Sequence, residues 1–447
     1  MEQYVIIGNG VATVGCIEGI RSVDKESPIT VVSGENHKVY GRPLISYYLQ
    51  GKTDLERMKY RPDDYYDKNG VNLLLGKTAV SVDTTAAGTT AGSVDTTAAG
   101  TTAGSVDTAA AGTTAGSVDT TAAGCVVLDD GTKLPYTKLC VATGSSPFVP
   151  PFENLESVKE KYSFMTLDDS LALEKALSPE AKVLIVGAGL IGLKCAEGIA
   201  DRVASVTVCD LADRVLSSIL DTECAALMQR HLEKNGMTFL LGDSVARFES
   251  NKAFMKSGAE VDFDVLVLAV GVRANIGLVK DAGGETDRGI IVEDDMSTTL
   301  PGIYAAGDCA QGPDLSIGAK RVLAILPNAY MQGHTAGVNM AGGEASLKNA
   351  IPMNSIGFFG LHAMTAGSYE GDLYEEKTED SIKRLFTKDD VLKGYILIGR
   401  NERAGIYTSM IREKTPISSV NFDILKKAAT TVGFDADARK KKFASQV

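Results

Sequence analysis

Two short glycine motifs have the spacing at which a protein backbone holds the pyrophosphate of a dinucleotide. Gly8-Asn9-Gly10 follows an apolar run that starts at Tyr4, and residues 11–21 after it can form a helix. Gly187-Ala188-Gly189 follows a second apolar run in the same way. At such a strand–turn–helix the glycines allow a sharp turn and a close approach of phosphate, which the N–H groups and positive dipole end of the helix bind. Two such sites in one chain predict two nucleotides that exchange electrons.

The two motifs differ in completeness. The second continues to Gly192, where strand and helix must pack closely, whereas the first has Thr13 at that position. The first motif alone therefore leaves open a tightly packed strand and helix without a ligand. We expect Val11 and Ala12 to line the first site and Ile191 to line the second.

A carboxylate follows the second strand of each predicted unit. Glu35 comes after the predicted strand 29–32, and Asp210 ends the predicted strand 206–210. A carboxylate here accepts hydrogen bonds from ribose hydroxyls, and Asp210 would repel a 2′-phosphate, so NADH is favoured over NADPH. Arg214 is the residue that could reverse this preference. Glu35 lies two residues beyond the usual place, so an exposed loop glutamate is the alternative for it.

The segment 39–52 mixes aromatic residues, a proline and two cations. We expect it to pass over a flat ring system, with Pro43 beside the ring. Arg42 and Lys52 would then hold phosphates or a negatively charged reduced ring. Ordinary surface charge is the alternative for both cations.

Further along the chain, three predicted strands are each followed by a short segment that contains glycine. They are Thr143-Gly144 after strand 136–141, Gly271 after strand 264–270, and Gly307-Asp308 after strand 302–306. A long helix is predicted over residues 328–340, and Pro150-Pro151 marks a domain boundary. This alternation of strands and helices predicts an α/β protein with two Rossmann-like units, in which the chain returns to the first unit after the second. The last hundred or so residues predict a third domain.

Residues 81–124 are a tandem repeat of a 12-residue unit, Ser-Val-Asp-Thr-Thr-Ala-Ala-Gly-Thr-Thr-Ala-Gly in its first two copies. Each copy holds one sizeable apolar residue, too little to bury a stacked core. Removing three copies leaves a simple hairpin, and long insertions at a hairpin tip cost little free energy. We therefore interpret the repeat as a dispensable insert at a hairpin tip, with a binding module as the alternative.

Composition excludes several classes of function. A net charge of −12 over 447 residues argues against nucleic-acid binding, which depends on phosphate neutralisation. No apolar run is long enough for a membrane helix, and a first strand at Tyr4 leaves no room for a secretory signal, so we expect a cytoplasmic protein. The seven cysteines form no Cys-x-x-Cys pair and the four histidines are scattered, so no metal site is predicted.

Taken in order, these motifs resemble those of the pyridine nucleotide-disulfide oxidoreductase superfamily of two-dinucleotide flavoproteins. The resemblance implies an FAD-binding domain at 1–150 and 273–340, interrupted by an NAD(P)-binding domain at 151–272. A C-terminal α+β domain at 341–447 would follow, often used in the family for homodimerisation.

The resemblance also implies roles for individual residues. Asp308 would bond the flavin side chain, and Thr143-Gly144 and Val80 would line the FAD site. The helix following Asn328 would point its N-terminus at the pyrimidine edge of the flavin.

Two departures from the family refine the expected chemistry. Disulfide reductases carry a redox cysteine beside the flavin, but no cysteine lies between Cys16 and Cys125. Thiol relay chemistry is therefore not expected. The glutamate that the family frequently has after Ile-Gly-x is replaced by Lys194, so the usual nicotinamide contact is not carried over.

The pattern of residues 40–52 is similar to the branch that contains NADH:rubredoxin reductases and the flavin part of NADH-dependent nitrite reductases. We therefore expect an FAD-dependent NADH oxidoreductase that passes electrons to rubredoxin or another small iron protein. The alternatives are an NADH oxidase that reduces oxygen directly and a non-catalytic flavin-binding interaction protein.

Overall fold

The first glycine motif lies between a strand and a helix, as predicted. In this computed structural model, which describes residues 2–84 and 123–443, β1 (Tyr4–Ile7) leads through the motif into α1 (Val11–Val23). Five parallel strands form a sheet in the order β19-β7-β1-β2-β3. The other strands of this sheet are β2 (Ile29–Ser33), β3 (Val71–Leu75), β7 (Lys138–Val141) and β19 (Ile303–Ala305). Because β19 comes from far along the chain, the first unit is built from two separate parts of the sequence.

The second glycine motif opens a second parallel sheet, with the order β12-β11-β10-β16-β9. Its strands are β9 (Lys161–Tyr162), β10 (Lys182–Val186), β11 (Ser205–Asp210), β12 (Met237–Leu241) and β16 (Val265–Leu268). Its helices are α4 (Leu167–Ala176), α5 (Leu190–Ile199) and α6 (Thr222–Lys234). A small antiparallel sheet of β13 (Val245–Glu249), β14 (Lys252–Met255) and β15 (Glu260–Asp262) packs beside it. We call this part the nucleotide unit and the first the FAD unit, after the predicted ligands.

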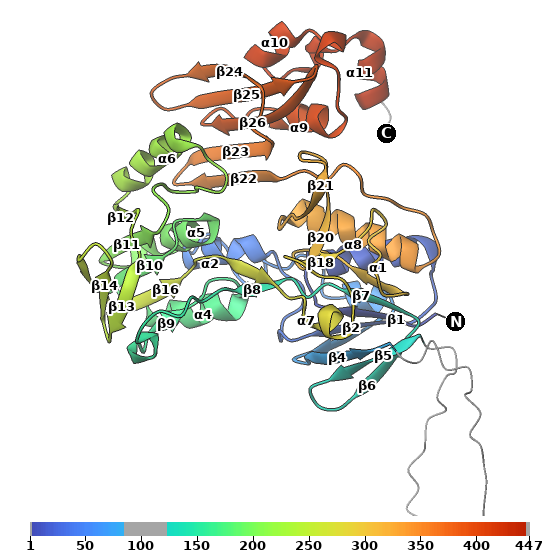
Figure 1. The fold of residues 1–447 in the computed structure, drawn as a ribbon. Coiled ribbons are helices and arrows are strands. Elements are labelled where there is room, and N and C mark those ends of the chain that lie inside the picture. The colour runs from blue at the N-terminus through green and yellow to red at the C-terminus, as the bar shows by residue number, and fades with distance from the viewer. Residues whose placement is uncertain (1, 85–122, 444–447) are drawn as a thin grey trace, which may run out of the picture.

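A short antiparallel ribbon joins the two units. The chain leaves the FAD unit through β8 (Ser145–Pro147) and returns through β17 (Val272–Ala274), and these two strands pair with each other. Figure 1 shows the ribbon running between the two sheets. The predicted architecture of one Rossmann-like unit inserted in another is therefore confirmed, whereas the domain limits at residues 150, 272 and 340 stay predictions.

Helices α1 and α8 (Leu326–Met340) close the FAD unit by packing backbone against backbone. A Cβ atom on Gly15 or Gly19 of α1 would collide with carbonyl oxygens of α8. A Cβ atom on Gly333 or Gly337 of α8 would collide with carbonyl oxygens of α1. Only glycine at these four positions allows the observed approach, because any side chain would push the helices apart. Helix α8 begins two residues earlier than predicted, since Pro327 is well suited to the first helical turn.

The other elements of the FAD unit are short. They are α2 (Ile45–Leu49), α3 (Tyr65–Lys68), α7 (Gly277–Asp281), and a small sheet of β18 (Ile290–Ile291), β20 (Ala310–Asp314) and β21 (Ala319–Val322). A further sheet contains β4 (Ala79–Asp83), β5 (Gly124–Leu128) and β6 (Lys133–Tyr136).

The strands that flank the tandem repeat pair as a hairpin. Strands β4 and β5 are antiparallel, with Asp83 opposite Cys125. The predicted hairpin is thus present at the base of the repeat, while residues 85–122 lie outside the described part of the chain.

The C-terminal part is an antiparallel sheet in the order β22-β23-β26-β25-β24 with three helices. Its elements are β22 (Met353–Phe358), β23 (Leu361–Gly367), β24 (Asp372–Lys377), β25 (Ile382–Lys388), β26 (Val391–Ile398), α9 (Ala404–Arg412), α10 (Phe422–Lys427) and α11 (Ala436–Phe443). The sheet is anchored to the nucleotide unit by Arg384, whose guanidinium pairs with Asp221 and Glu223 at the start of α6. Figure 1 shows this part lying across the other two units.

Within the described residues, no helix is both long and apolar enough to cross a membrane. All seven cysteines are free thiols, and all but Cys125 are buried.

Deleting residues 85–120 tests the interpretation of the repeat. The deletion leaves Thr84 and residues 121–123 to join the paired ends of β4 and β5. Because the loop to be closed becomes about tenfold shorter, we expect a gain in stability of about 2 kcal/mol or less and unchanged FAD content. Thermal unfolding and the flavin-to-protein ratio are the measurements. Loss of the flavin would contradict the interpretation and favour a binding role for the repeat.

Candidate functional site

The first glycine cradle is built by two glycines with different tasks. Gly8 has φ +110°, and a Cβ there would collide with the carbonyl oxygen of Ala142, so Gly8 shapes the turn itself. Gly10, the residue before α1, has ordinary backbone angles, and a Cβ added there would meet no protein atom within 4 Å. The space at Gly10 is therefore open to a ligand. Thr13 is buried, and its hydroxyl donates to the carbonyl oxygen of Gly8 at 2.8 Å, which explains how threonine replaces the usual small residue.

The second cradle has the same construction. Gly187 has φ +120° and faces the carbonyl oxygen of Ala269, while Gly189 has open space. A Cβ on Gly192 would collide with the carbonyl oxygen of Gly187, so Gly192 is the close-packing residue that the sequence indicated. Val11 and Ala12 begin α1, and Ile191 is the second residue of α5, so each lies in the first turn after its cradle.

Asp210 holds the nucleotide cradle through both of its carboxylate oxygens. Oδ2 accepts from the backbone N–H of Ala188 at 2.6 Å, and Oδ1 accepts from that of Ala212 at 2.8 Å. Arg214 is engaged elsewhere, because its guanidinium pairs with Asp213 and donates to the carbonyl oxygen of Leu220. The carboxylate of Asp210 therefore lies where the ribose is expected to bind, and Arg214 is paired with other groups. This arrangement supports the predicted preference for NADH.

Thr143 and Gly144 are clamped by a residue that the sequence did not single out. Asn275 donates through Nδ2 to the carbonyl oxygen of Thr143 at 2.9 Å, and its backbone N–H donates to that of Gly144 at 2.9 Å. The Thr143 hydroxyl in turn donates to the carbonyl oxygen of Asn275 at 2.8 Å. The β8–β17 ribbon makes this contact, and no local motif in the sequence signals it.

Asp308 is half-buried just beyond the end of β19 in the FAD unit. Burial raises the pKa of its carboxyl group, and the nearby positive charge of Arg42 partly offsets this. The Ser145 hydroxyl donates to its Oδ2 at 3.4 Å. The backbone N–H of Gly307 is held by Gln332 of α8 at 2.9 Å, so the Gly-Asp turn is fixed by α8. Neither Ser145 nor Gln332 was predicted from the sequence.

Glu35 and Arg42 form an ion pair, with Arg42 Nη2 at 2.6 Å from Glu35 Oε1. The Tyr40 hydroxyl donates to Glu35 Oε2 at 2.8 Å, and burial raises the pKa of this phenol. Arg42 also donates to the carbonyl oxygen of Met165 at 2.8 Å, and Tyr40 accepts from the backbone N–H of Leu167. The structure therefore joins two predicted site residues to each other and ties both to the nucleotide unit.

The remaining predicted residues are placed as follows. Pro43 is exposed in a short turn after Arg42, and Lys52 is exposed in the turn that follows α2. Val80 is 55% exposed on β4, and Gly271 has φ +127° directly before β17. Their roles in cofactor binding stay predictions.

Asn328 provides a direct test of whether the FAD unit fits a polar ligand. Its side chain is only 1% exposed, and its Oδ1 has no hydrogen-bond partner among the described residues. A buried amide oxygen without a partner costs free energy unless a ligand supplies a donor. Together with the open space at Gly10 and the half-buried carboxylate of Asp308, this acceptor without a partner fits FAD.

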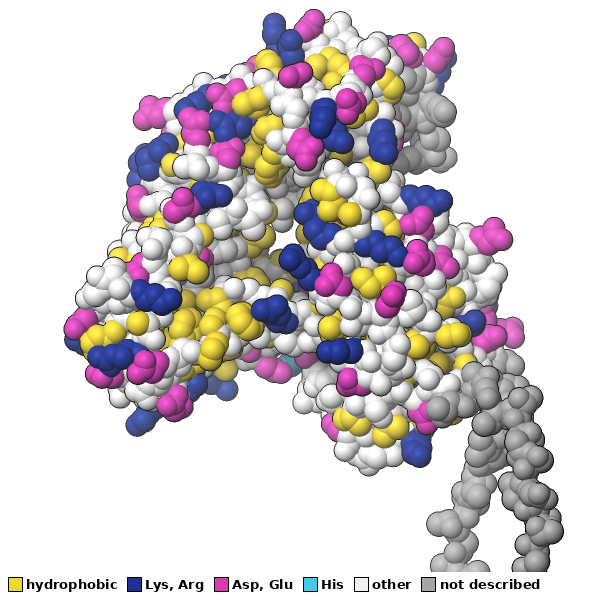
Figure 2. Space-filling view, viewed as in Figure 1, with side chains coloured by type: hydrophobic (Ala, Val, Ile, Leu, Met, Phe, Trp, Pro, Cys, Tyr) yellow, Lys and Arg dark blue, Asp and Glu magenta, His cyan; other side chains and the backbone are white. Residues whose placement is uncertain are grey.

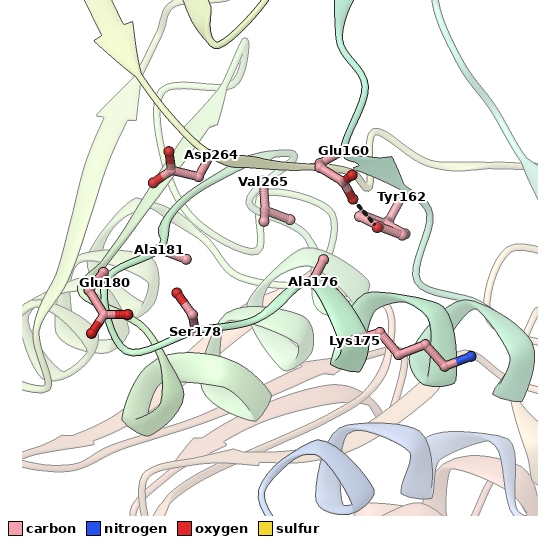
Figure 3. A pocket seen from close by; sticks show the side chains of 9 residues that line it. All are labelled: Glu160, Tyr162, Lys175, Ala176, Ser178, Glu180, Ala181, Asp264 and Val265. Atoms are coloured by element: carbon pink, nitrogen blue, oxygen red, sulfur yellow. Dashed lines mark hydrogen bonds between the residues drawn. The ribbon is translucent and has the colours of Figure 1, made fainter.

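The hollow drawn in Figure 3 is a different feature. It is lined by residues such as Glu160, Lys175, Glu180 and Asp264, and its volume is about 640 Å³. Ala181 and Asp264 directly precede β10 and β16, so the hollow opens at the amino ends of these strands. Dinucleotides bind at the carboxyl ends of a parallel sheet, and the hollow is therefore not the nucleotide site.

Cys309 follows Asp308 directly in the sequence. Its Sγ lies 3.3 Å from the carbonyl oxygens of Val141 and Ala306, and burial raises its pKa to about 11. It is therefore a protonated thiol at neutral pH rather than a nucleophile. Among the described residues, no cluster of histidine, cysteine and acidic side chains has the arrangement of a metal site.

Replacing Gly10 or Gly189 by alanine separates ligand binding from folding. Neither replacement meets a protein atom, so each apoprotein should unfold at the wild-type temperature. Because a methyl group would occupy the path of the pyrophosphate, G10A should weaken FAD binding and G189A should weaken NADH binding, each roughly tenfold or more. Fluorescence titrations of the apoprotein with FAD and, separately, with NADH give the dissociation constants.

G8A is the matched control, since its methyl group would collide with backbone and should destabilise the fold itself. Wild-type ligand affinities in both G10A and G189A would contradict the assignment of the cradles.

Because of Asp308, we expect the stability of the apoprotein to depend on pH. Its folded pKa is raised above the ordinary value of 3.8, so the contribution of this group to stability is largest below that pH and is lost as the pH rises through the folded pKa. D308N removes this half-buried charge. The apoprotein of D308N should therefore be more stable than wild type at pH 7, while its affinity for FAD falls roughly tenfold or more.

Denaturant unfolding of the two apoproteins between pH 4 and pH 8 measures this difference, which should shrink toward the acidic end. A destabilised D308N apoprotein at pH 7 would show that the carboxylate is a structural group.

Comparisons with known proteins agree with this geometry. A sequence profile of the family described as pyridine nucleotide-disulphide oxidoreductase matches residues 2–333. The epsilon subunit of NADH-dependent phenylglyoxylate dehydrogenase from Aromatoleum evansii is 29% identical over 431 residues, covering 93% of each chain. The assimilatory nitrate reductase electron transfer subunit of Bacillus subtilis is 30% identical over 427 residues, covering 92% of this chain. The chain spans only about half the length of that relative, 50%.

A solved structure has the same fold. The reductase in the covalent putidaredoxin reductase–putidaredoxin complex superposes with a TM-score of 0.81 at 21% identity, covering 96% of this chain and 97% of the other. The family profile extends over both glycine cradles, the β8–β17 ribbon and the Gly-Asp turn. The chain belongs to the pyridine nucleotide-disulphide oxidoreductase family.

Proposed function

We propose that this protein is an FAD-dependent NADH oxidoreductase that passes electrons to a small iron protein such as rubredoxin, without a redox-active disulfide. The names of two relatives support a role in electron transfer that involves a nicotinamide nucleotide. One is called an NADH-dependent dehydrogenase subunit, and the other an electron transfer subunit. Together the two names suit a chain that exchanges electrons between a nicotinamide nucleotide and another partner.

The observation that carries the proposal is the position of the two cradles at opposite ends of one short ribbon. Strand β7 ends just before Thr143-Gly144 and β8, and strand β16 ends just before Gly271 and β17. The three paired residues of β8 and β17 span roughly 7–10 Å. The carboxyl ends of the two sheets, where dinucleotides bind, are therefore neighbours. Such a distance suits two nucleotides that react with each other.

Each residue group has a task in the proposed reaction. Gly8, Gly10, Thr143, Gly144, Asp308 and Asn328 would hold FAD, and Gly187, Gly189, Gly192 and Asp210 would hold NADH. When bound, the flavin supplies the chemistry by accepting a hydride from NADH and releasing its electrons to the acceptor. The protein supplies proximity and orientation, which can account for a large share of the rate.

A thiol relay is not part of the proposal. The segment from Tyr40 to Lys52, whose helix α2 packs on α5 of the nucleotide unit, contains no cysteine. Cys309, the thiol beside Asp308, is buried and protonated at neutral pH. Seven unpaired cysteines suit a reducing compartment, so we keep the predicted cytoplasmic location within the proposal.

The surface around the junction of the units suits a charged protein partner. Figure 2 shows a hollow between the nucleotide unit and the FAD unit, below the C-terminal part, with lysine and arginine side chains on its rim. These cations lie near acidic side chains, in a chain whose net charge is −12. An acidic acceptor protein would be attracted to this rim, and the attraction would weaken with salt.

The proposal also includes a homodimer that forms through the C-terminal part.

An anaerobic experiment tests the function. Protein loaded with FAD is mixed with NADH or with NADPH, and the flavin absorbance is followed. We expect NADH to bleach the flavin with at least roughly tenfold higher efficiency than NADPH, because Asp210 would repel a 2′-phosphate. The reduced protein is then mixed with rubredoxin, with ferredoxin or with oxygen, and the iron proteins should reoxidise it faster than oxygen.

Two outcomes would contradict the proposal in different ways. Fast turnover with oxygen and none with iron proteins would make the protein an NADH oxidase. A flavin that NADH fails to bleach would make it a non-catalytic flavin-binding protein.

A further inference from the structure

Lys194 lies where the three parts of the molecule meet. It is the fifth residue of α5, and its ammonium group pairs with the carboxylate of Glu197 one turn later. The ammonium also donates to the carbonyl oxygen of Gly357 at 3.2 Å and lies 4.7 Å from the ring centre of Tyr47. The side chains of Lys194 and Glu197 are only 15% and 6% exposed. A charged pair this deeply buried needs further partners, because the desolvation of both groups must be offset.

Those further partners come from different parts of the chain. Tyr47 belongs to α2 of the FAD unit, and Gly357 belongs to β22 of the C-terminal part. Glu197 Oε1 accepts from the backbone N–H of Phe359, in the turn between β22 and β23, at 2.7 Å. The ion pair on α5 therefore fixes α2 on one side and the β22–β23 turn on the other. In Figure 1, α5 lies between α2 and β22.

Helix α2 connects this junction to the FAD site. It begins directly after the turn Arg42–Leu44, and Arg42 is the cation whose charge lowers the pKa of Asp308. The backbone of α2 rests on α5, since a Cβ on Gly198 would lie 3.2 Å from the carbonyl oxygen of Ser46. Gln50, at the end of α2, donates to the carbonyl oxygen of Glu197 at 3.1 Å. The α2–α5 contact thus sets the distance between the segment beside Asp308 and the helix that opens the nucleotide cradle.

We propose that Lys194 is a positioning residue that, through Tyr47 and Glu197, locks α2 and the β22–β23 turn onto α5 and so sets the alignment of the two nucleotides. A cation against an aromatic face is attracted more strongly when it is shielded from water, and the Lys194 side chain is largely shielded while Tyr47 is half-buried. In this proposal the ammonium acts through Tyr47 rather than by contact with a nucleotide. This inference rests on the proposed function, because it concerns the alignment that hydride transfer needs.

The informative variant is K194M/E197Q. K194M alone would leave the Glu197 carboxylate buried with one backbone donor, and the cost of that unpaired charge could unfold the protein by itself. In the double variant both side chains are neutral, and the amide oxygen introduced by E197Q still accepts from the backbone N–H of Phe359. Because a small displacement of reacting groups costs a large factor in rate, we expect the limiting rate of anaerobic flavin reduction to fall roughly tenfold to a hundredfold. The NADH concentration at half saturation should stay within roughly twofold, since the cradle at Gly187–Gly192 is intact.

Tyr47 supplies a matched pair of variants. Y47F keeps the aromatic face and should reduce at the wild-type rate, whereas Y47L removes the face and should match K194M/E197Q. Combining Y47L with K194M/E197Q should cost no more than either alone, because both break one interaction. K194R, which keeps the cation, should retain most of the wild-type rate.

Hydrogen–deuterium exchange gives a readout that does not depend on turnover. In the protein without NADH, the amides of residues 45–49 and 357–360 should exchange faster in K194M/E197Q and Y47L than in wild type. Exchange in β10 and β11, the core strands of the nucleotide unit, should be unchanged.

The inference is overturned if K194M/E197Q is reduced at the wild-type rate, or if exchange at residues 45–49 does not change. It is also overturned if half saturation moves strongly while the limiting rate does not, because Lys194 would then be a binding contact. Reduction of the wild-type protein by NADH is measured first. Its failure would defeat the proposed function, whereas success followed by any of these outcomes would defeat only the role of Lys194.

Discussion

The contact between the backbones of α1 and α8 is the constraint on which the FAD unit depends. Four glycines, Gly15 and Gly19 on α1 and Gly333 and Gly337 on α8, let the helix axes approach so closely that any Cβ would collide. This contact brings a helix from late in the chain onto the helix that opens the first cradle. Helix α8 in turn positions Gln332 against Gly307. The site is therefore complete only when the two ends of the FAD unit have come together around the inserted nucleotide unit.

The β8–β17 ribbon imposes the second constraint. Both connections between the units run through it, so the units are linked by paired strands rather than by two independent loops. Asn275, directly after β17, holds Thr143 and Gly144 at the edge of the FAD unit. Movement of the nucleotide unit about this ribbon would disturb the backbone that lines the first site. The contact between α2 and α5 is a separate restraint on the same movement.

Features of the site that depend on local backbone geometry were predictable from the sequence. The two cradles, the packing role of Gly192, the position of Asp210 and the hairpin at the base of the repeat each follow from spacing within a short window. Contacts between distant residues were not predictable. Asn275 lies 132 positions from Thr143, and nothing near either residue signals that they meet. A contact within one turn was also missed. The Thr13 hydroxyl donates to the carbonyl oxygen of Gly8, and the glycine motif does not predict that a threonine fits at this position.

Buried charges at the junctions of the units differ from two polar groups in the FAD unit. Where units meet, buried charges are fully paired: Lys194 has Glu197 and Gly357, and Arg384 has carboxylates from two elements. In the FAD unit, by contrast, Asn328 keeps an acceptor without a partner among the described residues, and Asp308 carries a carboxyl group whose pKa is raised by burial. A chain selected for stability alone would remove both costs. Their presence at the carboxyl edge of a parallel sheet, beside an open glycine, is explained if a bound cofactor supplies the missing hydrogen bonds.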